Sequence, residues 1–71
     1  MSQWGARKAR SVLGALLTIG WQIKRHGGGS HRVLARPGWP DVVFAFHDGD
    51  EIAPRMLARI ARVTGLRPED L

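Results

Sequence analysis

The sequence WQIKRHGGGSHRVLAR at residues 21–36 contains two short strand patterns on either side of a glycine run. Residues 21–25 alternate apolar and polar side chains, which predicts a strand with one buried face. Residues 32–36 predict a second strand, and the glycine-rich residues between the two predict a flexible connection. His31 therefore stands just past the glycine run, where the second strand begins.

The segments on either side of this hairpin give the chain an α-β-β-β-α order. Upstream, apolar residues spaced three and four apart over residues 7–19 predict an amphipathic helix. Downstream, residues 42–46 predict a third strand after a five-residue turn over residues 37–41, and Pro54 begins a helix that ends at Gly65. We therefore predict an α+β fold, with a three-stranded antiparallel sheet, both helices on one face and the other face open.

The length of 71 residues predicts one small domain over residues 1–71, with a thin stability margin because so short a chain buries little surface. The chain has no cysteine, and its three histidines lack the spacing of a zinc site, so we expect no metal and no cofactor. The longest apolar run, residues 12–19, is too short to cross a membrane. We expect a cytoplasmic protein that makes no membrane contact.

The charges are unevenly distributed along the chain. Residues 1–40 carry seven Lys and Arg and no Asp or Glu, whereas residues 41–71 carry four basic and six acidic side chains. Such segregation favours a cationic face that binds RNA or DNA. A basic surface that serves only solubility is the alternative interpretation.

His31 is the candidate for proton transfer, since the ordinary pKa of histidine, about 6.5, lies close to neutral pH. Lys24, Arg25 and Arg32 can supply positive charge to a phosphorane, and the glycine run can bring backbone N–H groups to a phosphate. The alternative for His31 is an exposed histidine without a role. His47 is expected to be a surface residue rather than a catalyst. It can take part in a second proton transfer only if the fold brings it near His31.

Two further features have a functional and a structural interpretation. Trp39, in the predicted turn, can stack on a base or anchor a partner, or it can fold back on Pro37 or Pro40. Arg55, Arg59 and Arg62 share one face of the second predicted helix, which is typical of a solvated face.

Several short motifs resemble those of the HicA toxins of HicAB toxin–antitoxin pairs. The matching residues, in chain order, are Gly20-Trp21, Arg25, Gly29-Ser30-His31, Phe44-Ala45-Phe46-His47, Glu51-Ile52, Pro54, Leu57 and Thr64-Gly65-Leu66. The resemblance covers about residues 9–66, and Gly-Ser-His at this distance after Gly-Trp is its most specific part. The chain departs from many members in having Arg32 where they carry a second histidine, and in its longer glycine run.

The resemblance implies a fold like the double-stranded RNA-binding domain and a metal-independent endoribonuclease that cleaves mRNA until a HicB-like antitoxin silences it. The family's catalytic histidine maps to His31, which is then the single catalytic histidine. The residues expected to bind RNA are Lys24, Arg25, Gly29, Ser30, Arg32 and Trp39. The alternatives are a non-catalytic RNA-binding module of the same fold and a purely structural subunit.

Overall fold

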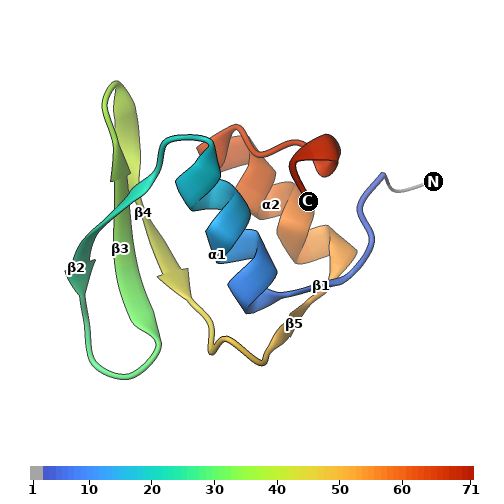
Figure 1. Ribbon diagram of the computed structural model, residues 1–71, viewed down its shortest axis with the longest axis horizontal. Helices are drawn as coiled ribbons and strands as arrows, with labels where there is room; N and C mark the ends of the chain where they lie inside the picture. The colour runs from blue at the N-terminus through green and yellow to red at the C-terminus, as the bar shows by residue number, and fades with distance from the viewer. Residues whose placement is uncertain (1–2) are drawn as a thin grey trace.

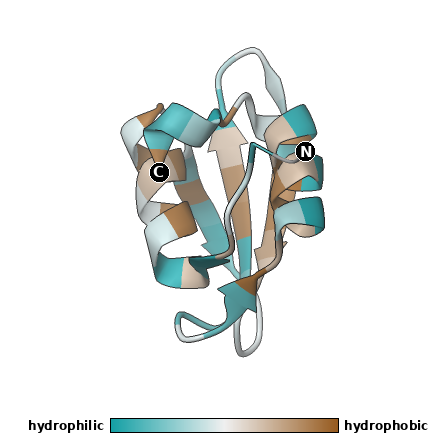
Figure 2. Ribbon diagram, turned by 90° about the vertical axis from the view of Figure 1, so that its right-hand side faces the viewer, coloured by the Kyte–Doolittle hydropathy of each residue, from teal (hydrophilic) through white to brown (hydrophobic). Residues whose placement is uncertain are grey.

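A three-stranded antiparallel sheet and two helices make up the body of the computed structural model, which describes residues 3–71. The strands lie in the order β2 (Gln22–His26), β3 (His31–Arg36) and β4 (Trp39–Ala45). Helices α1 (Ala9–Thr18) and α2 (Pro54–Thr64) both pack on one face of this sheet, as Figure 1 shows from the side and Figure 2 from the helix side. The predicted α+β fold is confirmed. Residues 1–2 of the predicted domain lie outside the described residues.

A second, two-stranded sheet pairs β1 (Arg7–Lys8) with β5 (Glu51–Ile52), and a 3-10 helix, η1 (Pro68–Asp70), follows α2 near the end of the chain. The sequence placed Arg7 and Lys8 inside the first helix, which is wrong. The helix begins at Ala9 instead, where the backbone N–H donates to the carbonyl oxygen of Asp50 at 2.7 Å. A loop distant in the sequence therefore caps the start of α1, and the residues near Ala9 give no indication of this contact.

The core lies between the two helices and the inner face of the sheet. Its buried apolar side chains are Ala9, Val12, Ala15, Leu16, Trp21, Leu34, Phe44, Ile52, Leu57, Ile60 and Leu66. Trp21 is 1 % exposed, and its indole Nε1 donates to the backbone carbonyl of Thr64 at 2.9 Å. This bond joins the segment that leads into β2 to the last turn of α2.

The strand β4 begins at Trp39, three residues earlier than the sequence predicted, so the turn contains only Pro37–Gly38. The pairing with β3 shifts by one residue here, and Pro40 and Asp41 together stand opposite Ala35. Such a β-bulge in an edge strand accommodates a proline, because the missing N–H need not donate to a neighbouring strand. The prediction of a five-residue turn over residues 37–41 was wrong for this reason.

Candidate functional site

His31 is the first residue of β3 and lies on the sheet face that the helices leave open. It pairs with the exposed Ala45, whereas the next pair, Arg32 with the buried Phe44, faces the helices. Paired residues of antiparallel strands share a face, and successive residues alternate between faces. We define the outer face by the strand residues Arg25, His31, Val33, Val43 and Ala45.

The imidazole of His31 has a defined orientation. Its Nδ1 lies 3.2 Å from the carbonyl oxygen of Gly28. A carbonyl can only accept a hydrogen bond, so Nδ1 carries the hydrogen, and in the neutral ring Nε2 carries the lone pair. The side chain is exposed, and Nε2 is thus free to take a proton from a substrate on the outer face.

The glycine run before His31 forms a hydrogen-bonded turn. The backbone N–H of Gly27 donates to the carbonyl oxygen of His31 at 2.8 Å, and the N–H of His31 donates to Gly28 at 3.3 Å. Gly29 has a φ of +64°, a conformation that favours glycine. A Cβ on Gly27 would lie 3.0 Å from the Cβ of His31, so the absence of a side chain there gives the histidine its room.

Lys24 and Arg25 both lie on β2, but only one of the two charges is free of an ion pair in the part of the chain that the structure describes. Lys24 is the extra residue of a second bulge, and its Nζ contacts Asp41 Oδ2 at 2.8 Å. Arg25 has no ion-pair partner within residues 3–71. It pairs with Val33, which makes it a diagonal neighbour of His31, and such neighbours are typically about 7–8 Å apart. Arg25 is therefore a cation free to meet an anion beside His31.

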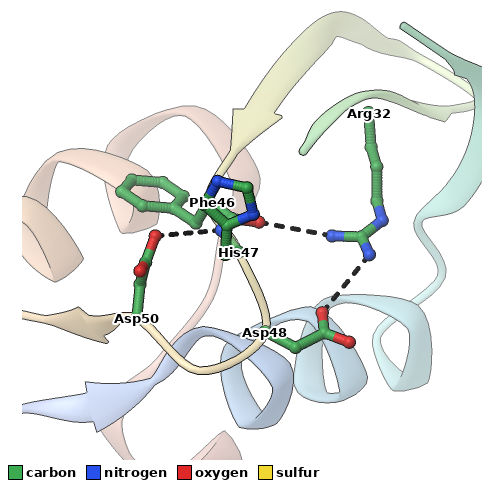
Figure 3. Close-up of polar contacts among 5 residues, drawn as sticks. All are labelled: Arg32, Phe46, His47, Asp48 and Asp50. Atoms are coloured by element: carbon green, nitrogen blue, oxygen red, sulfur yellow. Dashed lines mark hydrogen bonds and ion pairs between the residues drawn. The ribbon is translucent and has the colours of Figure 1, made fainter. Parts of the chain in front are cut away.

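Arg32 faces away from His31. Its guanidinium contacts the carbonyl oxygen of Phe46 at 3.5 Å and Asp48 Oδ1 at 3.3 Å, with 20 % of the side chain exposed (Figure 3). These contacts tie β3 to the loop that follows β4. The structure thus separates Arg32 from the cationic group that the sequence proposed around His31.

Trp39 lies at the other end of the sheet from His31. The rise of β3 from His31 to Arg36 is about 17 Å, and the β3–β4 turn is at the end opposite the glycine turn (Figure 1). The Trp39 ring packs edge-on against Trp21 with centroids 5.9 Å apart, and Arg36 lies 5.4 Å over it. Trp39 folds back over the helix ends, because its ring also lies where a Cβ on Gly65 would meet it at 3.0 Å.

The edge of β4 beside α2 holds a shallow pocket of about 320 Å³. Its lining residues are Trp39, Pro40, Asp41, Val42, Arg62 and Val63. The α2 arginines, Arg55, Arg59 and Arg62, form no ion pair with any residue from 3 to 71. They lie on the helix layer, away from the outer face.

His47 lies at the same end of the sheet as His31, two residues beyond the Ala45 that pairs with His31. Its backbone N–H donates to Asp50 Oδ2 at 2.9 Å (Figure 3). The N–H of Asp50 donates back to the His47 carbonyl at 2.9 Å. The sequence did not predict where His47 lies relative to His31, because that depends on how β3 and β4 pair.

Within residues 3–71, no group of three or more metal-ligating side chains of His, Asp or Glu comes together. No helix in that range has the length and apolar character needed to cross a bilayer.

The fold and the site define a small α-β-β-β-α domain that presents an oriented histidine and a nearby arginine on an open sheet face. A family model described as the HicA toxin of bacterial toxin–antitoxin systems matches residues 9–66. The chain belongs to this family, which gives it the role of a toxin with an antitoxin partner and, in general terms, that of a nuclease. No curated protein matches the chain.

Proposed function

We propose that this toxin is a metal-independent endoribonuclease that cleaves mRNA in the cytoplasm and is silenced by a HicB-like antitoxin. One observation carries the proposal: His31 lies on the open face with Nδ1 bonded to Gly28, while Nε2 has no hydrogen-bond partner among residues 3–71. His31 is also the one histidine to which the family resemblance gives a catalytic role. Its imidazole supplies the proton transfer that RNA cleavage needs.

In the proposed reaction, Nε2 of His31 takes the proton of a ribose 2′-OH, and the 2′-oxygen attacks the adjacent phosphorus. The bond from phosphorus to the 5′-oxygen breaks, which leaves a 2′,3′-cyclic phosphate and, once protonated, a 5′-hydroxyl end. Such acid–base catalysis typically raises the reaction rate by about 10²–10⁴-fold. Arg25, the unpaired cation beside His31, stabilises the charge that develops on the phosphorane.

The RNA contacts proposed on the outer face are Lys24, Arg25, Gly29 and Ser30. The backbone N–H groups of Gly29 and Ser30 have no hydrogen-bond partner in the described part of the chain. Consecutive N–H groups in a turn bind phosphate oxygens, so this turn can hold the phosphate next to His31. Arg32 and Trp39 are left out of this set because their side chains are used within the fold.

Purified protein is expected to cleave single-stranded RNA equally well with and without EDTA and to leave 2′,3′-cyclic phosphate ends. Gel analysis of end-labelled RNA with enzymatic end-group mapping checks this result. Loss of cleavage in EDTA, or 5′-phosphate products, would contradict the proposed mechanism. RNA binding that weakens with salt but never leads to cleavage would instead identify a non-catalytic RNA-binding module.

The glycine turn provides a second test. Gly27→Ala forces the His31 side chain to shift by a few tenths of an ångström, so we expect cleavage to fall by about 3- to 10-fold. Gly28→Ala is the matched control, because a Cβ there meets nothing within 4 Å and the carbonyl that orients His31 remains. Equal cleavage rates for the two variants would show that the close approach at Gly27 does not position His31.

A further inference from the structure

We propose that His47 is a second catalytic residue, the general acid that protonates the 5′-oxygen as it leaves. This inference rests on the proposed function, in which His31 is the general base. The site then uses two catalytic histidines, whereas the sequence led us to expect one.

The pairing of Ala45 with His31, continued by two residues, puts His47 on the same side of the sheet as His31. Phe44 and Phe46 both turn toward the helices and contact each other with ring centroids 5.0 Å apart. The inward–outward alternation of β4 therefore continues past its last paired residue, and His47 follows Ala45 on the outer side. Two residues past the Ala45–His31 pair, this position is diagonal to His31, and residues so related in a regular sheet are typically about 7–8 Å apart. This spacing leaves room for a phosphate between the two rings.

The backbone around His47 is held from several directions. Asp50 closes the turn through its carboxylate and its N–H, and its carbonyl accepts the N–H of Ala9 at the start of α1. The guanidinium of Arg32 binds the carbonyl of Phe46 and the carboxylate of Asp48 (Figure 3). Arg32, Asp48 and Asp50 thus all have partners, which hold the loop in place.

The His47 ring itself makes no hydrogen bond or ion pair with any residue from 3 to 71, and the residue is exposed. Its backbone is fixed while its side chain is free, which suits a group that meets a substrate.

The geometry of the reaction calls for this second group. In an in-line displacement the attacking 2′-oxygen and the leaving 5′-oxygen lie on opposite sides of phosphorus. The imidazole of His31, which the Gly28 carbonyl holds beside the attacking 2′-oxygen, cannot also reach the 5′-oxygen on the opposite side of phosphorus. In the proposed step, Nε2 of His31 gains the 2′-OH proton, the phosphorus–5′-oxygen bond breaks, and an imidazolium N–H of His47 gives its proton to the 5′-oxygen. One proton is gained and one released, and the charge balances.

The test compares ordinary RNA with an RNA that carries sulfur in place of the bridging 5′-oxygen at a linkage mapped as a cleavage site of the wild type. A thiolate leaves without protonation. We expect His47→Ala to cleave ordinary RNA about 10²- to 10⁴-fold more slowly than the wild type, and the sulfur substrate at a near wild-type rate. His31→Ala is expected to be impaired on both substrates, because it lacks the base.

His47→Gln, checked to have the melting temperature of the wild type, separates loss of the acid from loss of folding. An unchanged rate on ordinary RNA, or a defect that persists on the sulfur substrate, would overturn the assignment of His47. If the sulfur substrate restored cleavage by His31→Ala instead, His31 would be the acid, and the assignment of His47 as the acid would be overturned as well. A wild type that cleaves neither substrate would overturn the proposed function itself, which is a different result from a cleaving wild type with an unaffected His47 variant.

Discussion

Replacing His31 with alanine is expected to lower RNA cleavage by about 10²- to 10⁴-fold, the usual contribution of a proton-transfer group. The variant keeps the strand, because His31 lies at the exposed start of β3 and contributes nothing to the core. Single-turnover cleavage of labelled RNA measures the loss. Expression in bacteria without antitoxin gives a second measurement, in which the wild type arrests growth and depletes mRNA while the variant does neither.

His26→Ala is the matched control for this experiment. His26 is an exposed histidine in the same hairpin, but it pairs with Arg32 and so points to the opposite side of the sheet from His31. We expect its cleavage rate and growth arrest to equal those of the wild type. Growth arrest that persists in His31→Ala would remove the catalytic assignment of His31.

Replacing Trp21 with alanine is expected to destabilise the protein by about 3–5 kcal/mol, the usual cost of emptying a buried aromatic site. A chain of this size has a total stability of about 4–11 kcal/mol, so the loss takes a large share of it and moves the unfolding midpoint to a much lower urea concentration. The change removes a 1 % exposed side chain and leaves the Thr64 carbonyl without its indole donor. Urea unfolding followed by circular dichroism measures the effect.

Trp39→Ala is the comparison for Trp21, because the two rings contact each other but Trp39 is 38 % exposed and its ring nitrogen holds no bond across the core. We expect a loss of about 1–2 kcal/mol with a cooperative transition retained. A larger loss for Trp39 than for Trp21 would show that the contact over the helix ends, rather than the buried indole, holds the layers together.

The parts of the fold that were predicted correctly have local signals. Helix α2 runs from Pro54 to Thr64 as expected, since proline suits the first helical position and Gly65 adopts a φ of +76° at the end. The pairing of Arg7–Lys8 with Glu51–Ile52 has no such signal, because two-residue strands join segments far apart in the chain. The early start of β4 was missed because a bulge absorbs Pro40.

Only part of the candidate site was predicted, because contacts between strands have no local signal in the sequence either. Proximity in sequence grouped Arg32 with His31, whereas strand alternation sends the two side chains to opposite faces and Asp48 holds Arg32 there. The place of His47 depends on the register between β3 and β4, which no single-strand pattern reveals. The motif around His31 could be found, but its orientation needed the Gly28 carbonyl.

The loop between β4 and β5 joins three parts of the molecule at once. Its carbonyls receive the first N–H groups of α1, its Asp48 receives Arg32 from β3, and its Asp50 closes the turn on His47. An added or deleted residue would break at least one of these attachments and move one histidine against the other. The loop is thus a fixed-length spacer that tolerates no insertion, whereas the Pro37–Gly38 turn at the far end of the sheet is the place where the chain can lengthen.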